Sequence, residues 1–499
     1  MRAVIIGSGF GGLAIGLRLL AKGYEVMIIE SREKVGGRAY QLKLGGYTFD
    51  MGPSLITAPG LFDELFCLFG KKREDYLEFV RLDPYYRIYF EKKSGDGFQV
   101  IDYNGDPEHM RGEMEKLEPG GGKAYDAFFE ATRPIYDLAY KKYGRLPFLT
   151  LKSFIKILPE MLKVGAVLPM TCFAKRFFRS DFGMRTFSFH PLYIGTNPYN
   201  APAALGFIPW LEREEGVWFA KGGMYCVVDA LRRLFLENGG VIHCEERVHR
   251  LEVLRDNPRV ISKVITDVDE YEVDLVVSNA DVLGTYNMLS ENSGAVRRKI
   301  RSVQNKSYSM SLLLLYFGLN RQYHDKLAHH TLILGKEYKG LLEEVFNEKV
   351  LPTTLSMYLH IPSVTDSSMA PEKCESMYIL IPLPNLSGSL IWDDNVEKKI
   401  RDFAVDYLEN TFGLEGFSKS IVEERRMNPN DFMFQLNSTY GAAFSTQLSL
   451  LQSVYFRAHN RSDEIDNLFF VGAGTHPGPG VPGVLMTAAC TDSLIPAVK

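Results

Sequence analysis

RAVIIGSGFGGLAIGLRLLAKGYEVMIIE, residues 2–30, is the stretch that decides the fold. A short apolar run, Ala3–Ile6, leads into a glycine-rich turn at residues 7–12, and a segment with helical spacing, Leu13–Lys22, follows. A glycine ends that segment, and a second apolar run, Val26–Ile29, comes after it. Short apolar runs predict buried strands, whereas the apolar spacing of the middle segment predicts a helix. The stretch is therefore predicted to form strand, glycine turn, helix and strand.

The turn has the glycine spacing of a dinucleotide-binding site. Gly7 permits the tight turn, Gly9 lets the backbone approach a pyrophosphate, and Gly12 lets the helix pack closely. Gly11 lies in the same turn, and the helix that follows directs unpaired N–H groups at the phosphates. Glu30, 23 residues after Gly7, is placed to accept a hydrogen bond from a ribose hydroxyl. An ordinary strand–turn–helix unit, the competing interpretation, would not require an acid at this distance.

A glycine pair and an arginine follow at once. Gly37 again lets backbone come close, and Arg38 can bind a phosphate through two parallel hydrogen bonds. The glycine turn, Glu30 and Gly-Gly-Arg together resemble flavoproteins of the amine-oxidase type, which bind FAD. The carboxylate at position 30 favours a ribose without a 2′-phosphate. Since the sequence has no second glycine fingerprint for a nicotinamide cofactor, one flavin site is expected.

Length and charge limit the class of protein. A chain of 499 residues exceeds what one hydrophobic core usually holds, so two or three domains are expected. The 57 basic and 61 acidic residues nearly balance, which does not favour nucleic acid as a partner. We expect an α/β fold with three parts: a discontinuous Rossmann-like FAD-binding domain (residues 1–80, 216–300 and 465–499), a substrate domain with a mostly antiparallel sheet (81–125 and 301–464), and a helical, membrane-facing cap (126–215).

Apolar and alternating runs predict the strands of the other sheets. The substrate-domain sheet is expected to contain Tyr85–Tyr89, Phe98–Tyr103, Ser309–Gly318, Thr353–His360 and Met377–Pro382. A separate small sheet is expected from Val260–Ile265 and Glu272–Val277.

Metal and disulfide sites have little support in the sequence. The six cysteines are scattered without a C-x-x-C pair, and no group of histidines has metal-ligand spacing. His190, which precedes a proline in an aromatic segment, is interpreted as a structural or pocket residue rather than a metal ligand. We therefore expect no metal.

Residues 141–180 are basic and apolar at once. They contain nine Lys or Arg residues against Glu160 alone, with Phe, Leu and Ile between them. A solvated helix over a core is one interpretation, and a surface that contacts a membrane without crossing it is the other. Pro159 is expected to split the segment into two short helices. No apolar run reaches the roughly 20 residues needed to cross a bilayer.

Seven blocks along the chain resemble the bacterial-type phytoene desaturase family and occur in that family's order. They are GSGFGGLA with GGRAY (7–14 and 36–40), FDMGPSLITAP (49–59), FSFHPLYIGTNPY (187–199), EGVWFAKGGM (215–224), LAHHT (327–331), LHIPSVTDSSMAPE (359–372) and VGAGTHPGPGVPGV (471–484).

The resemblance implies an FAD-dependent enzyme that desaturates the C40 carotene 15-cis-phytoene in successive steps towards lycopene. It implies that the flavin is held by the residues named above together with Gly52, Pro53, Ser54, Val248, Asn279, Gly472, Gly474, Pro482, Gly483 and Val484. A carotene has no polar group, and 32 Phe, 26 Tyr and 3 Trp can line a long apolar slot for it. We name no catalytic acid or base from the sequence.

The same interpretation implies the partners of the enzyme. With no nicotinamide site, electrons are expected to pass to oxygen or a membrane quinone, and the protein is expected peripherally on the cytoplasmic side of the cell membrane. Three alternatives stay open: desaturation of a C30 or modified carotenoid, flavin-dependent carotene isomerisation without net redox change, and a non-enzymatic lipid-binding escort protein.

Overall fold

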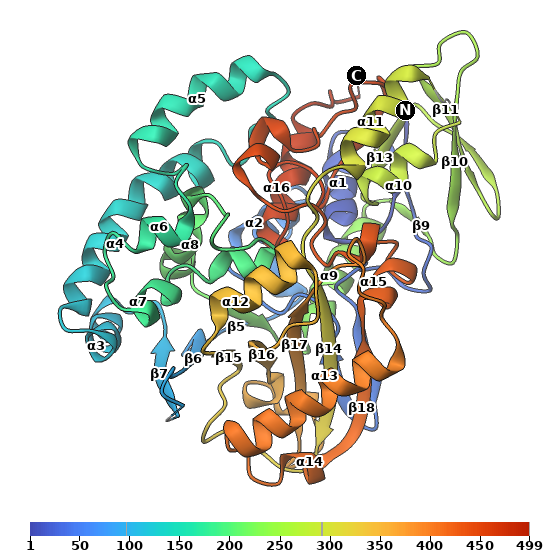
Figure 1. Ribbon diagram of the computed structural model, residues 1–499. Coiled ribbons are helices and arrows are strands. Elements are labelled where there is room, and N and C mark those ends of the chain that lie inside the picture. Colours follow the sequence, from blue (N-terminus) through green and yellow to red (C-terminus); the bar gives the residue numbers. More distant parts are fainter. Residues whose placement is uncertain (96, 291–292, 499) are drawn as a thin grey trace.

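A parallel sheet of five strands forms one half of the molecule (Figure 1). The computed structural model describes residues 1–95, 97–290 and 293–498. Every neighbouring pair of strands in this sheet is parallel. In spatial order, the strands are β19 (Leu468–Phe470), β13 (Leu275–Ser278), β1 (Arg2–Ile6), β2 (Glu25–Ile29) and β9 (Val241–His243). The predicted strand–turn–helix–strand unit is confirmed, because helix α1 (Phe10–Ala21) connects β1 to β2.

Helices from distant parts of the chain cover this sheet. Helix α1 packs against α9 (Met224–Glu237) and α16 (Val481–Asp492), and α16 also contacts α2 (Gly60–Cys67). The Lys22 ammonium fixes the C-terminal segment by donating to the carbonyl of Ile495 at 2.7 Å. The two ends of the sequence therefore meet on one side of the sheet.

One strand assignment from the sequence is wrong. The small antiparallel sheet consists of β10 (Val248–Val253), β11 (Ile261–Thr266) and β12 (Glu270–Glu272). Residues Leu275–Ser278 do not continue it; they form β13, which lies between β1 and β19. All four residues of β13 are buried, as expected for a strand covered on both faces of a parallel sheet.

A seven-stranded sheet forms the other half, and its neighbouring strands are antiparallel except for β15 and β6. In spatial order the seven strands are β18 (Ile421–Met427), β14 (Ser311–Leu319), β17 (Glu375–Leu383), β16 (Met357–His360), β15 (His330–Leu334), β6 (Tyr86–Glu91) and β7 (Phe98–Tyr103). The five strands expected from the sequence are among them, four with shifted ends, whereas β15 and β18 were not expected. Side chains of α13 (Asp394–Asp406), including Ile400 and Ala404, join the core on one face. The opposite face packs towards the helical region.

The helical region lies at the upper left of Figure 1. Its helices are α3 (Pro107–Leu117), α4 (Gly121–Tyr136), α5 (Leu151–Lys163), α6 (Met170–Ala174), α7 (Asp181–Thr186) and α8 (Phe207–Glu215). Within the described ranges, none of the helices combines the length and apolar content that a membrane-spanning segment needs.

The expected break at Pro159 is wrong, because α5 continues through it as one helix. A proline removes one donor, whose acceptor would be the carbonyl four residues earlier, at Ile155. The Ile155 side chain is 56% exposed, so this turn faces solvent and water can satisfy that carbonyl. Glu160 also holds the helix, since its carboxylate accepts from the Lys142 ammonium at 2.8 Å and from the Tyr143 hydroxyl at 3.0 Å.

Asp50 connects strand β4 (Tyr47–Asp50) to the start of α9 and precedes the Gly52–Ser54 loop. Its Oδ1 accepts a hydrogen bond from the Met224 amide at 2.8 Å, while its buried Oδ2 has no partner among the described residues. Burial raises the pKa of Asp50 to about 7, and the amide hydrogen bonds at the helix start oppose this shift only in part.

This pKa predicts a pH-dependent stability. Because the folded protein binds the Asp50 proton more tightly than the unfolded chain, the free energy of unfolding should fall as pH rises from about 4 to about 7, by at most about 1.4 kcal/mol per pH unit. Chemical denaturation at several pH values measures it. Asp50→Asn cannot ionise, so the difference in stability between parent and variant should change across this window and level off above it. Parallel pH profiles would contradict the assignment.

Candidate functional site

The side chain of Asn279 brings the predicted glycines together. Asn279 follows β13, and its amide lies against the glycine turn after β1 and the turn after β19. A Cβ added to Gly9 would lie 2.8 Å from Asn279 Nδ2, and one added to Gly11 or Gly472 would lie 2.5 or 2.7 Å from Asn279 Oδ1. A side chain at any of the three positions would therefore require the Asn279 amide to move, and Gly472, with φ of +98°, also needs glycine for its backbone conformation.

Glu30 lies at the end of β2 and is 6% exposed. Its carboxylate accepts hydrogen bonds from the Ser8 amide and the Arg32 amide, each at 3.0 Å. These two bonds fix the orientation of the carboxylate at the cavity wall, where a ribose hydroxyl could donate to it. Gly37, with φ of +57°, packs its backbone against Gly9: an added Cβ would lie 3.2 Å from Gly9 Cα.

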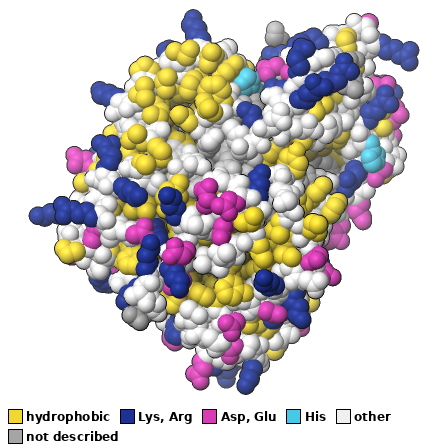
Figure 2. All heavy atoms as spheres, viewed as in Figure 1, with side chains coloured by type: hydrophobic (Ala, Val, Ile, Leu, Met, Phe, Trp, Pro, Cys, Tyr) yellow, Lys and Arg dark blue, Asp and Glu magenta, His cyan; other side chains and the backbone are white. Residues whose placement is uncertain are grey.

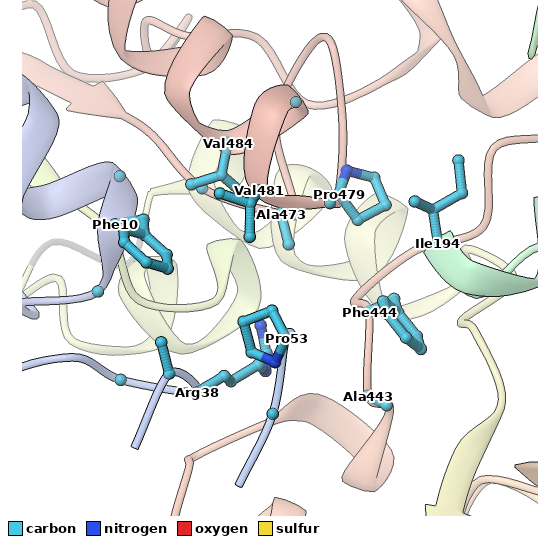
Figure 3. Close-up of a pocket in the computed structure, with 18 of the residues that line it drawn as sticks. Phe10, Arg38, Pro53, Ile194, Ala443, Phe444, Ala473, Pro479, Val481 and Val484 are labelled. Atoms are coloured by element: carbon cyan, nitrogen blue, oxygen red, sulfur yellow. The ribbon is translucent and has the colours of Figure 1, made fainter. Parts of the chain in front are cut away.

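Arg38 and the Gly52–Ser54 loop form the facing wall (Figure 3). The Arg38 guanidinium donates to Ser438 Oγ at 2.6 Å, and its buried Nε has no partner within the described ranges. In Figure 3, Pro53 and Arg38 lie opposite Val481 and Val484 across the cavity. The start of α16 at Val481 places its unpaired N–H groups on that side.

The structure places fifteen of the seventeen predicted cofactor residues in the wall of one cavity, including Val248 from β10, Asn279, Pro482, Gly483 and Val484. Gly12 and Gly474 are not in the wall. A Cβ on Gly12 would lie 2.0 Å from the Gly7 carbonyl oxygen, so this residue serves the close packing of the turn. A Cβ on Gly474 would lie 3.1 Å from Ser445 Oγ.

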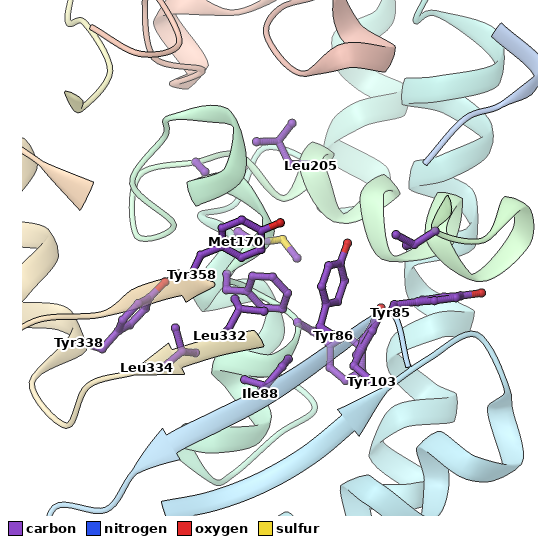
Figure 4. Close-up of a cluster of buried hydrophobic side chains, with 14 of the residues drawn as sticks. Tyr85, Tyr86, Ile88, Tyr103, Met170, Leu205, Leu332, Leu334, Tyr338 and Tyr358 are labelled. Atoms are coloured by element: carbon purple, nitrogen blue, oxygen red, sulfur yellow. The ribbon is translucent and has the colours of Figure 1, made fainter. Parts of the chain in front are cut away.

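The cavity has a volume of about 780 Å³ and continues from the glycine turns to the seven-stranded sheet. Its second half is lined mainly by apolar side chains, among them Leu192, Leu205, Leu211, Leu312, Leu332, Leu380, Phe432 and Phe444. Figure 4 shows Tyr86, Leu332 and Tyr358 from neighbouring strands on the side of the sheet that faces the helix carrying Leu205. One continuous space therefore joins a polar nucleotide-like site to an apolar slot.

Polar groups lie in the wall of the apolar half, and of these the sequence pointed to Ser54 and His190 but not to Tyr358, Tyr378 or Glu212. The Ser54 hydroxyl is 2.7 Å from the Tyr358 hydroxyl and 3.0 Å from the Tyr378 hydroxyl. Glu212, on α8, is 1% exposed and lies with His190 in the same wall. Only folding places these residues together, and no local motif marks Glu212.

Three histidines that have no metal-ligand spacing in the sequence lie together in the fold. His329, His330 and His360 are buried, and one ring nitrogen from each lies within 4.8 Å of the others. His360 Nε2 is 3.2 Å from His329 Nε2, His330 Nδ1 is 2.7 Å from the Tyr358 hydroxyl, and burial lowers the pKa of His329 to about 3. The cluster is thus neutral, and hydrogen bonds already use several of its nitrogens.

The residues present fit FAD. The glycine turns carry no side chain between their backbone and the cavity, and Glu30 offers carboxylate oxygens whose orientation is fixed. The Nε of Arg38 has no partner among the described residues, and the N-terminus of α16 faces the same space. A pyrophosphate needs donors and close backbone approach, and a ribose needs an acceptor. The apolar half of the cavity can hold a hydrophobic substrate beside it.

Comparison with known proteins agrees with this geometry. Residues 10–490 match the family described as flavin containing amine oxidoreductase. The chain is 39% identical over 493 residues to the phytoene desaturase (lycopene-forming) of Pantoea ananas, covering 98% of each chain. It is also 39% identical to the phytoene desaturase (lycopene-forming) of Pseudescherichia vulneris, covering 99% of each.

Among solved structures, an oxidoreductase from Methanosarcina mazei superposes with a TM-score of 0.65 at 16% identity, covering 98% of this chain and 99% of the other. At this identity the likeness concerns the fold.

Gly52 provides a test of the flavin-facing loop. A Cβ at Gly52 would lie 2.1 Å from the Arg38 carbonyl oxygen, so Gly52→Ala must displace one of the two backbones. Such overpacking costs about 1–3 kcal/mol, which corresponds to a fall in flavin affinity of about 5–150-fold. The flavin absorbance per purified chain measures it. Gly60→Ala at the start of α2 is the matched control, because nothing lies within 4 Å of its added Cβ. Equal flavin content in both variants would refute the prediction.

Proposed function

The chain belongs to the flavin-containing amine oxidoreductases and, within them, to the bacterial-type phytoene desaturases, and from this we propose that it desaturates 15-cis-phytoene in successive steps towards lycopene. It is an FAD-dependent oxidoreductase. The observation that carries the proposal is the continuous cavity, which joins the glycine turns to an apolar slot. A hydrocarbon can be recognised only by apolar area and shape, and this slot offers both.

The chain's own residues position the two reactants. The glycine turns, Glu30, Arg38 and the start of α16 would hold FAD, and FAD bound there would supply a hydride acceptor beside the slot. Leu312, Leu332 and Leu380, from strands of the large sheet, line the slot for the carotene. Their packing keeps water from the reacting carbons.

An acceptor of the oxygen or quinone class must then take the electrons. The sequence provides one dinucleotide fingerprint, which the flavin uses, so a nicotinamide cofactor has no corresponding glycine turn. Isomerisation would need no net acceptor, and a lipid-binding escort would bind carotene without changing it. Consumption of an acceptor therefore separates these three activities.

Anaerobic mixing of the purified holoprotein with phytoene in liposomes should bleach the flavin absorbance without added nicotinamide. Admission of oxygen, or addition of a quinone, should restore the absorbance, and extraction should yield a carotene with more conjugated double bonds. Squalene, a hydrocarbon without the central conjugated triene, is the control substrate. Strict dependence of turnover on NAD(P) would contradict the electron route, and pigment formation without acceptor consumption would indicate isomerisation.

A membrane-docking surface on α5 is the second part of the proposal. Leu151, Ile155 and Leu162 share one side of α5 and are 47%, 56% and 55% exposed. Figure 2 shows apolar side chains gathered in this upper-left region of the molecule. Lys152 and Lys156 flank the apolar row, and their side chains are exposed. Apolar side chains beside lysines are the pattern of a helix lying in the interface of an anionic bilayer.

The same side of the molecule supports access for a lipid-soluble substrate. Tyr140 and Gly144, in the segment that leads to α5, line the cavity. Phe154 of α5 contacts Phe456, with ring centroids 5.2 Å apart. A carotene and a quinone both dissolve in the bilayer, so docking here would bring each to the cavity. We place the protein on the cytoplasmic face of the cell membrane in this proposal; its six cysteines are free.

Liposome flotation tests the docking surface. Lys152/Lys156/Lys163→Glu should float at least about tenfold less with anionic vesicles, because each lysine near an anionic surface contributes about 1 kcal/mol. Leu151/Ile155/Leu162→Gln should also bind less, and high salt should weaken the parent. The control Lys398/Lys399/Lys419→Glu changes three exposed lysines of α13 and α14 (Phe417–Ser420), at the opposite end of Figure 1. Equal flotation of all variants would refute this surface.

A further inference from the structure

A buried carboxylate and a buried imidazole form a pair in the wall of the apolar slot. Glu212 is 1% exposed and His190, in the short 3-10 helix His190–Ile194, is 0% exposed. His190 Nε2 lies 3.2 Å from one Glu212 oxygen, and the Tyr86 hydroxyl donates to the other at 2.6 Å. A hydrocarbon substrate cannot hydrogen-bond to any of them. A slot that only bound a carotene would be more stable with apolar side chains such as leucine at these positions, because burying polar groups costs free energy.

The hydrogen bonds determine which imidazole nitrogen is free. Burial raises the pKa of Tyr86 well above its ordinary value, and the nearby Glu212 charge adds to the shift, so the phenol stays protonated and donates. Because the Tyr86 hydroxyl donates to one Glu212 oxygen, the other oxygen is left to accept from the Nε2–H group of the His190 ring. Nδ1 then carries a lone pair, and it is buried without a partner among the described residues.

Aromatic contacts connect the pair to the flavin-facing loop. The Tyr193 ring is 5.8 Å from the Tyr86 ring and 6.1 Å from the Tyr358 ring, and the Tyr358 hydroxyl is 2.7 Å from Ser54 Oγ. The rings of Tyr193 and Tyr358 thus lie between the Tyr86–Glu212 hydrogen bond and Ser54. His190, Glu212, Tyr193 and Ser54 all line the same cavity.

We propose that His190 Nδ1 accepts the proton that the carotene loses in each desaturation, and that Glu212 positions the ring and stabilises the imidazolium. The inference rests on the desaturase function proposed above. One carbon loses a hydrogen with its bonding pair to the flavin, and its neighbour loses a proton to His190. The electron pair of the second carbon–hydrogen bond becomes the new carbon–carbon π bond. A quinone or oxygen finally takes up two electrons and two protons, one of them from His190, which is neutral again.

The other polar groups of this wall are poorer proton acceptors. The hydroxyls of Tyr358 and Tyr378 already hydrogen-bond with Ser54, and Tyr358 also with His330. The Tyr193 hydroxyl has no partner among the described residues, but burial raises its pKa well above the ordinary value, so it stays a neutral phenol. An imidazole held by a carboxylate is the stronger base, as in hydrolases that pair the same two groups.

The kinetic test uses the flavin-loaded protein and phytoene in liposomes without oxygen. His190→Gln should lower the rate of flavin bleaching by about 10²–10⁴-fold, the range for loss of a general base. Flavin content, phytoene binding and thermal midpoint should stay near the parent's values. His324→Gln is the matched control, because His324 is partly exposed and pairs with Glu375 away from the slot. Unchanged bleaching by His190→Gln would overturn the inference.

Glu212 is tested as a positioning residue by a readout independent of turnover. In histidine-labelled parent protein, ¹⁵N NMR should show His190 with its proton on Nε2 and a bare Nδ1. Glu212→Gln should alter the nitrogen shifts and slow bleaching, whereas Glu212→Asp should recover part of both. A His190 ring protonated on Nδ1 in the parent would overturn the assignment even if a variant failed to fold.

Bleaching of the parent protein and of the His190→Gln variant separates a wrong substrate from a wrong role for His190. If the parent protein is not bleached by phytoene, the proposed substrate is wrong, and the proton transfer proposed here is wrong with it. If the parent is bleached and turns over while His190→Gln matches it, only the role of His190 is wrong.

Discussion

The contact of one amide side chain with three glycines organises the nucleotide half of this protein. Asn279 occupies the space that side chains at Gly9, Gly11 and Gly472 would need. Its backbone amide also donates to the Ile6 carbonyl at 2.8 Å, which fixes β13 beside β1 at the point where the turn begins. Because protein interiors are close-packed, an added methyl group here would displace the Asn279 amide from its place between the turns. Segments far apart in the sequence are thereby held at the distances that a dinucleotide requires.

That arrangement has a counterpart in the apolar half. The slot walls come from the seven-stranded sheet and from the helical region, and their side chains share one core. The sheet supplies leucines and tyrosines at alternate positions of its strands, since alternate side chains point to the same face. The helical region supplies α8 with Glu212 and the short helix with His190. Substrate shape and proton chemistry therefore depend on the fit between these two parts.

The sequence predicted those features that local spacing encodes. The glycine turn with Glu30 and five of the seven strands of the large sheet follow from short-range pattern and were found, whereas β15 and β18 were not predicted. Three features depend on tertiary context: β13 joined the parallel sheet because β1 and β19 pair with it, α5 continued through Pro159 because solvent can satisfy the Ile155 carbonyl, and three histidines without metal-ligand spacing in the sequence converged in the fold. Glu212 carries no local signal at all, because its partners come from β6 and from the 3-10 helix that precedes α8. Asn279 is only a weak match to the flavin-binding residues of the family, yet its side chain contacts three of the predicted glycines in the structure.

The split of the parallel sheet along the chain also bears on biosynthesis. Strand β19 and helix α16 follow the whole of the seven-stranded sheet in the sequence, yet they complete the sheet and the wall that begin with β1 and α1. During translation, the edge of β13 that later pairs with β19 therefore stays unpaired until residues 468–484 leave the ribosome. Until then, Asn279 and the first glycine turn lack the second turn that packs against them. An unpaired edge is a template for wrong pairing. In the nascent chain, the β13 edge beside the first glycine turn is consequently exposed to wrong pairing until β19 covers it.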